Sequence, residues 1–139
     1  MAAISAVSVA LREAFLRGVR DFFLDAKTAN ARIKFYAGMQ PATPGGALDV
    51  SNALIATMTL DRPSGAIVTG ELRLVSSGVT LVGNDGVITW GRLEDGEGAW
   101  GFDGRAALEG DTNPLTLFFL EAVNVVAGGK IVLVSAKLK

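Results

Sequence analysis

From residue 31 to the C-terminus, short runs of β-branched and aromatic residues alternate with turn sequences, and this alternation constrains the fold more than any other feature. Asp61–Gly65, Asn84–Gly86 and Ala127–Lys130 contain the residues that tolerate turn conformations, glycine above all. Strands separated by turns at roughly 8–12 residues are typical of sandwiches, jelly rolls and barrels. We therefore predict a mainly β fold, a jelly-roll-like antiparallel β-sandwich preceded by an N-terminal amphipathic helix. The expected strands are Arg32–Ala37, Ala53–Leu60, Ala66–Leu74, Val79–Val82, Val87–Leu93, Ala99–Ala106, Leu115–Leu120, Ala122–Val126 and Lys130–Lys137.

The N-terminal segment, from residue 5 to about residue 27, predicts one amphipathic helix. One continuous apolar stripe consists of Ile4, Val7, Leu11, Ala14, Phe15, Gly18, Phe22 and Ala26, and a second arc of Val9, Leu16, Val19 and Phe23. The polar face is narrow: Glu13, Arg17, Arg20 and Asp21. We expect such a helix to touch both its own sheet and a partner. A helix sunk wholly in its own core is the alternative.

Length and composition indicate one domain with apolar surface left over. The 139 residues are enough for a single core, with residues 1–30 as helix and lead-in and residues 31–139 as the sandwich. Apolar residues make up 50% of the chain, yet no apolar run approaches the ~18 residues of a membrane span. We expect the surplus to lie in contacts within an oligomer or a protein shell.

Charge and targeting signals argue against several classes of partner. The net charge is −1 and the basic residues form no stripe, so nucleic acid is not an expected ligand. The N-terminus lacks the basic region of a signal peptide, and we expect no membrane partner. The chain has no cysteine, which is compatible with assembly in a reducing cytoplasm.

Histidine and cysteine are both absent, which removes the usual nucleophile–base pairs and nearly all zinc sites. We predict no enzyme activity, no catalytic residue, no cofactor and no metal. Two acidic groups are the remaining candidates: Glu94, Asp95 and Glu97 for a glycosidase pair or a calcium site, and Asp103, Glu109 and Asp111 for a cation site. Interspersed glycines favour a solvated turn for the first group. A small hydrolase built on Glu94, Asp95 and Asp103 is the least favoured function.

The two tryptophans allow two interpretations. Trp100, with Phe102 nearby, could form a sugar-stacking platform on the surface. Tryptophans inside predicted strands are more often core anchors, and we predict a core position for both Trp90 and Trp100.

Four segments carry a resemblance to a known family. Ile33, Phe35, Gly38, Pro41 and Ala42 match a pattern of the type I-K-I-Y-x-G-x-x-P-A, and Leu54–Leu60 looks like L-L-A-T-L-T-L. Gly86–Arg92, followed by Asp103 and Gly104, resembles G-T-A-T-W-x-R and an aspartate-glycine strand. The closing VVAGGKIVLVSAKL is similar to A-G-x-x-V-x-V-T-S-F-x-L. Glu109–Pro114 and Ala136-Lys137 depart from the pattern.

In this order, the segments resemble a family of small virion proteins of tailed phages and prophages, which includes the capsid cement (head decoration) proteins of Bordetella-type phages. The resemblance implies a jelly roll on the capsid exterior, assembled in the host cytoplasm. It implies the major capsid protein as partner and self-association as a homodimer. A cement protein would bridge neighbouring capsid subunits and stabilise the head by added contact area. The alternative is a tail-fibre or baseplate component that binds a receptor.

We expect two surfaces to make these contacts. The helix would contact a second subunit or the shell through Leu11, Phe15, Phe22 and Phe23. The loop Met39–Asp49, with Met39, Pro41 and Pro44, would be a docking arm, because proline lowers the entropy lost on binding. An ordinary exposed loop is the alternative for this segment.

Overall fold

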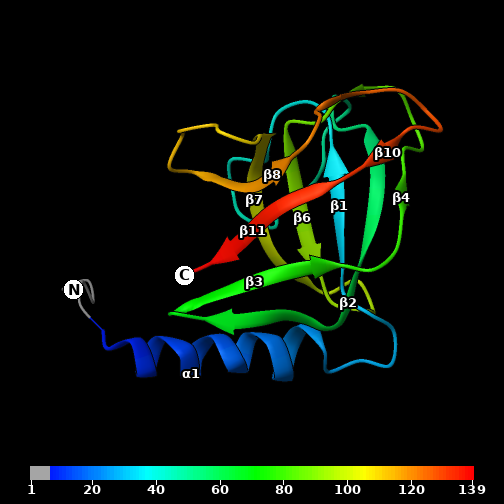
Figure 1. Ribbon diagram of the computed structural model, residues 1–139. Helices are drawn as coiled ribbons and strands as arrows, with labels where there is room; N and C mark the ends of the chain where they lie inside the picture. Colours follow the sequence, from blue (N-terminus) through cyan, green and yellow to red (C-terminus); the bar gives the residue numbers. More distant parts are fainter. Residues whose placement is uncertain (1–6) are drawn as a thin grey trace.

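The computed structural model describes residues 7–139, which form a helix packed against a closed seven-strand β-barrel (Figure 1). The order around the barrel is β1 (Arg32–Tyr36), β2 (Leu54–Val68), β3 (Glu71–Ser76), β11 (Leu133–Leu138), β8 (Thr116–Leu120), β7 (Trp100–Leu108) and β6 (Trp90–Glu94). Two small sheets pair β4 (Thr80–Leu81) with β10 (Lys130–Ile131), and β5 (Gly86–Val87) with β9 (Asn124–Val125). The predicted mainly β fold with an N-terminal helix is confirmed.

One pair of barrel strands departs from the predicted antiparallel arrangement. β7 and β8 run parallel, with Arg105 opposite Thr116 and Leu108 opposite Leu120. The connecting loop folds back along β7, where Asp111 accepts hydrogen bonds from the hydroxyl of Thr116 at 2.7 Å and from the backbone N–H of Asn113 at 3.2 Å. β8 therefore starts beside the middle of β7 and runs in the same direction.

β2 continues through a segment that the sequence predicts to be a turn. Its first half pairs with β1 and its second half with β3, and the register jumps from Leu60–Ser76 to Gly65–Leu74. Because proline has no N–H to donate, Pro63 is tolerated in this bulge, and the predicted turn at residues 61–65 is wrong. The chain turns instead at Thr69-Gly70, where both φ angles are positive (48° and 75°), as in a two-residue hairpin loop. That turn divides the predicted strand Ala66–Leu74.

The C-terminal strands find other partners than the sequence predicts. A turn at Ala127-Gly128 is present, but β9 before it pairs with β5, and β10 after it pairs with β4. β11 lies between β3 and β8. The predicted hairpin across residues 127–130 is therefore wrong, since closure of the barrel requires the last strand to pair with β3 and β8.

The helical segment joins the barrel by one face only. α1 (Val9–Val19) starts at Ser8, whose hydroxyl accepts from the N–H of Leu11 at 3.1 Å, and continues into a π-helical turn, η1 (Arg20–Leu24). It is shorter than predicted, and its expected residues 5 and 6 lie outside the described part. α1 lies along the β2–β3 hairpin (Figure 1). Leu16 and Leu24 are buried, while Val19 and Phe23 pack against the core.

The other apolar face of the helix is exposed. Leu11, Phe15 and Phe22 are 45%, 59% and 85% exposed. The helix thus contacts its own barrel and leaves a second face free. Phe23, expected in an intersubunit or shell contact, lies instead mainly against the barrel.

Candidate docking surface

The β1–β2 loop is fixed to the barrel by a buried ion pair. Arg92 on β6 and Asp103 on β7 are cross-strand neighbours, and their side chains are 13% and 1% exposed. Arg92 Nε and Nη2 donate to the two oxygens of Asp103 at 2.7 and 3.0 Å. Asp103 raises the pKa of the Arg92 guanidinium, chiefly through this hydrogen bond. A two-pronged pair of this kind has a defined geometry and can position whatever it bonds.

The same pair holds the tip of the loop. The N–H of Gly45 donates to Asp103 Oδ2 at 2.9 Å, and Arg92 Nη2 donates to the carbonyl of Gly46 at 2.9 Å. The indole N–H of Trp100 completes the set by donating to Asp103 Oδ1 at 3.0 Å. Both oxygens of the carboxylate are therefore occupied, which suits a structural role rather than acid–base chemistry.

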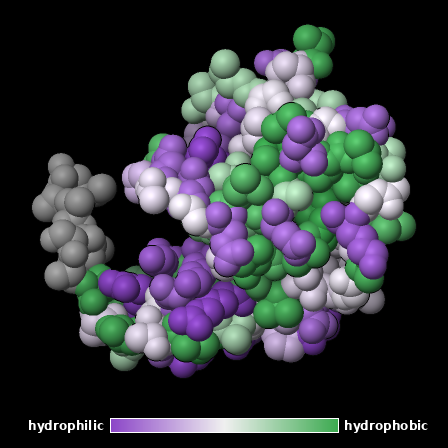
Figure 2. Space-filling view, turned by 45° about the horizontal axis from the view of Figure 1, so that its top comes forward, coloured by the Kyte–Doolittle hydropathy of each residue, from purple (hydrophilic) through white to green (hydrophobic). Residues whose placement is uncertain are grey.

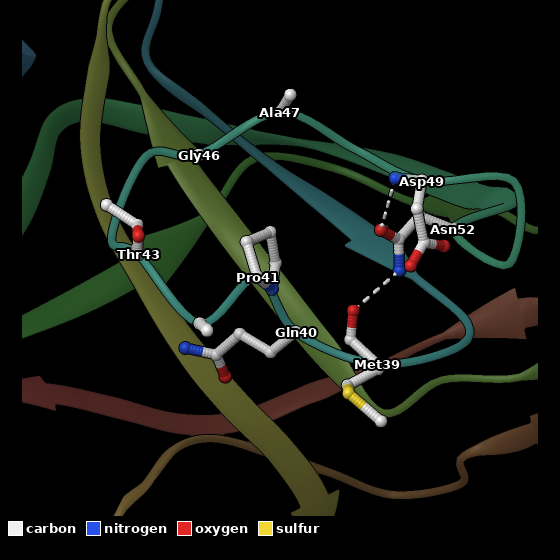
Figure 3. A pocket seen from close by; sticks show the side chains of 9 residues that line it. Met39, Gln40, Pro41, Thr43, Gly46, Ala47, Asp49 and Asn52 are labelled. Atoms are coloured by element: carbon white, nitrogen blue, oxygen red, sulfur yellow. Dashed lines mark hydrogen bonds between the residues drawn. The ribbon is translucent and has the colours of Figure 1, made fainter.

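The base of the loop is closed by Asn52 and Asp49. The side-chain amide of Asn52 donates to the carbonyl of Met39 at 2.8 Å, and its oxygen accepts from the N–H of Asp49 at 3.0 Å (Figure 3). The same amide also donates to the carbonyl of Ala37 at 3.1 Å. Ser51 donates to Asp49 Oδ1 through its hydroxyl and its N–H, and this lowers the pKa of Asp49. The loop is thus held at its tip and at its base.

We call residues 39–49 the arm, and the arm presents apolar groups to solvent. Met39 is 77% exposed and Leu48 is 42% exposed, while Val50, the next residue along the chain, is fully exposed. Pro44 is exposed and Pro41 is half-buried. The two limbs of the arm enclose an open cleft of about 300 Å³ (Figure 3), and a second cleft of about 440 Å³ lies beside it. A held loop with exposed apolar side chains can bind a protein surface without first becoming ordered.

A further apolar surface lies on the barrel, on the side of β4 and β10 (Figure 2). Its exposed residues include Val79, Leu81, Val132 and Val134. Scattered exposed apolar residues are ordinary, whereas a contiguous group is a candidate interaction surface. The apolar surplus expected from composition is thus located partly on the outside of the barrel.

The acidic cluster of residues 94–97 is structural, and the prediction of a solvated turn is wrong for two of its members. Glu94 and Asp95 are only 5% and 2% exposed. Glu94 pairs with Lys34 at 3.1 Å, and Asp95 accepts from the N–H groups of Glu97 and Ala99 at 2.9 Å. Sequence patterns missed this because the basic partner comes from β1.

The second acidic group is not assembled into a metal site. Asp103 is bound to Arg92, and Asp111 accepts from Thr116, Asn113 and Arg105. Over residues 7–139, no cluster of three or more acidic side chains is placed to hold a metal ion.

The two tryptophans differ in burial. Trp90 is fully buried and stacks on Tyr36, with ring centroids 4.7 Å apart, as predicted for a core anchor. Trp100 is 43% exposed, so the prediction of a core position is wrong for it. It lies instead beneath the arm, with its ring close to Gly45.

The positioning roles of Arg92 and Arg62 were not predicted from the sequence, and Asp103 was considered only as an acidic site residue. Arg92 and Asp103 both lie in segments that match the family pattern, Trp-x-Arg and Asp-Gly. That shared match is the sequence signal that could have pointed to the pair. Arg62 carried none: its guanidinium donates to the carbonyls of Asp25, Lys27 and Ala29 at 2.8, 2.5 and 3.0 Å. These bonds hold the connection from the helix to β1.

Comparison with protein families, with curated protein sequences and with solved structures finds no match for this chain. Within the described residues, no helix has the length and apolar character needed to cross a membrane.

Proposed function

We propose that the protein is a phage capsid cement protein, which binds the outer surface of the head and bridges neighbouring major capsid subunits. The observation that carries this proposal is the arm: Met39 and Leu48 are exposed on a loop that the buried Arg92–Asp103 pair fixes from below. Burial of an exposed apolar side chain contributes roughly 1.5–3 kcal/mol. Because the arm is already ordered, little of that free energy is offset by loop ordering.

The remaining parts of the proposal follow from the resemblance of the sequence to the tailed-phage virion proteins. The protein acts as a homodimer and has no enzymatic activity, no cofactor, and no nucleic-acid or membrane partner. It assembles in the host cytoplasm and resides on the virion exterior. The proposal includes the jelly-roll architecture that the resemblance implies, and the parallel β7–β8 pair departs from the usual antiparallel topology of that architecture.

Location on the particle is the first test. Particles from a strain that carries a tagged copy of the gene should show added density on the head by cryo-electron microscopy, and a deletion of the gene should remove it. Density on the tail, or a particle without the protein, would refute the proposal.

A pair of double variants tests the arm itself. Met39→Ser with Leu48→Ser replaces the two exposed apolar side chains of the arm and should lower head occupancy at least tenfold in a rebinding assay. Leu108→Ser with Val126→Ser is the matched control, because both side chains are also exposed (49% and 66%) but lie outside the arm. Equal occupancy for the two double variants would contradict the role of the arm.

A tail-fibre or baseplate component is the second candidate. The exposed Trp100 favours it, since an indole face can stack on a sugar ring. The arm covers part of that ring at Gly45, which argues for the cement protein instead.

A further inference from the structure

The exposed face of α1 and of the π-helical turn η1 that continues it carries four residues with a defined spacing, three on α1 and Phe22 on η1. Leu11, Phe15, Gly18 and Phe22 follow one another at intervals of 4, 3 and 4 residues. We call these four residues the seam. Leu11, Phe15 and Phe22 are 45%, 59% and 85% exposed. A Cβ added to Gly18 would meet no atom within 4 Å. The seam is therefore apolar, accessible, and hollow at one point.

The 4-3-4 interval is the spacing by which one helix packs lengthwise on another. In a two-fold pair centred between residues 16 and 17, an antiparallel partner brings Phe15 opposite Gly18 and Leu11 opposite Phe22. Each copy then inserts one ring into the gap that the other leaves. A parallel pair would place Phe15 against Phe15 and leave a void at Gly18. Antiparallel helices also oppose their macrodipoles.

We infer that the seam is the site of self-association, and that its occupant is the seam of a second copy of this chain in antiparallel orientation. The arrangement is isologous, since each contact is repeated by the two-fold axis and the assembly closes at two copies. The barrel lies on one side of α1 and leaves the other side open to a partner helix (Figure 1). This inference rests on the homodimer in the proposed function and assigns its interface.

The contact area of the seam is small for a specific interface. Two helices that pair over the length of the seam bury on the order of 1,000 Å² in total, which lies at the lower end of specific interfaces. We therefore expect a dimer that dissociates in the micromolar range. The seam and the arm would then serve different partners, with α1 joining the two copies and two arms left for the capsid.

An exchange of residues within the seam tests the inference. Light scattering and sedimentation should show the unaltered chain as a dimer at about 100 µM, the range of weak dimers. Gly18→Phe should weaken dimerisation at least tenfold, because the new ring meets Phe15 of the other copy. Phe15→Gly should weaken it similarly, by loss of the ring. The double variant Phe15→Gly with Gly18→Phe again places one phenylalanine opposite one glycine. Its dissociation constant should return to within a few-fold of the original.

The variants are matched, because the double variant has the composition of the natural chain. Position 18 is open and Phe15 is mostly exposed, so the fold should persist, and circular dichroism checks this. A monomeric unaltered chain, single variants that dimerise normally, or a double variant that stays monomeric would each overturn the inference.

A disulfide trap reads the orientation independently, since the chain has no cysteine of its own. When a Phe15→Cys chain is mixed with a Gly18→Cys chain and oxidised, the mixed disulfide should predominate. Predominant disulfides between identical chains would indicate a parallel pair and overturn the antiparallel seam.

Head binding is measured separately, so that the two proposals fail differently. A chain that decorates heads as a monomer would refute the seam and leave the cement function standing. A dimer with the expected seam that binds no head would do the reverse.

Discussion

Gly45→Ala should release the arm from the barrel, and its cost can be worked out against a matched control. Gly45 has φ +70° and Gly128 has φ +86°, so an alanine at either position takes on the left-handed backbone at about 1–2 kcal/mol. A Cβ at Gly128 would meet nothing within 4 Å. A Cβ at Gly45 would lie 2.8 Å from Trp100 Cδ2 and 2.9 Å from Cε3, well inside van der Waals contact.

The indole cannot easily move away, because its N–H is bonded to the buried Asp103 at 3.0 Å. The loop must shift instead, by about 1 Å, which stretches the 2.9 Å bond from the Gly45 N–H to the carboxylate beyond a normal hydrogen bond. Asp103 Oδ2 keeps its bond from Arg92 Nη2, so the cost is that of one lost hydrogen bond to a charged group, about 1.5–3 kcal/mol. We therefore expect Gly45→Ala to lower the free energy of unfolding by about 2.5–5 kcal/mol, against about 1–2 kcal/mol for Gly128→Ala.

Urea unfolding of both variants measures this difference, and tryptophan fluorescence locates it. Trp90 is fully buried, so a red shift in the folded variant would report Trp100 as it loses its cover. If Gly45→Ala and Gly128→Ala cost the same, and the emission is unchanged, the arm is not held on Trp100 and the reasoning fails.

Two further predictions concern stability. Arg62→Ala should cost about 1–3 kcal/mol in urea unfolding, because several exposed hydrogen bonds to the carbonyls of residues 25–29 are lost and water replaces them only in part. Arg17→Ala, whose side chain is 55% exposed and 3.9 Å from Glu13, should cost under about 0.5 kcal/mol. Equal losses would contradict the role given to Arg62. The hydrogen bond from Thr116 is the main cause that holds the pKa of Asp111 below its ordinary 3.8. That contribution to stability is therefore complete above pH 3.8 and is lost as the pH falls through the lower folded value. Asp111→Asn should flatten the acid limb of a stability–pH curve in this region, and an unchanged limb would argue against the prediction.

Local pattern was sufficient for several features of this protein. The alternation of apolar and turn residues predicted a mainly β chain, and the bounds of β1 agree with the expected strand to within one residue at its end. The helix was predicted with two apolar arcs, and the arc of Leu16, Val19 and Phe23 is the one that meets the barrel. These features depend on residues within one or two turns of each other, and periodicity reports such neighbours directly.

Features that depend on distant partners were not predictable. Pro63 and Gly65 read as a turn, yet β3 pairs across them and keeps the strand extended through a bulge. The sequence predicted Glu94 to be solvated. The β1–β6 pairing instead places Lys34, 60 positions earlier in the chain, beside it. In each case a pairing partner far along the chain overrides the local preference.

The sequence by itself determined that this chain is β-rich, begins with a two-faced helix, and lacks the histidine and cysteine on which most catalytic sites depend. Only the tertiary structure decided which helix face remains free and which loop is held. The barrel covers one apolar arc of the helix and leaves Phe15 and Phe22 in solvent, because the helix can pack against the single core by only one of its faces. It also brings Arg92 and Asp103 together under the arm, and a buried charge pair that is fully hydrogen-bonded can hold a loop that its own residues would leave loose.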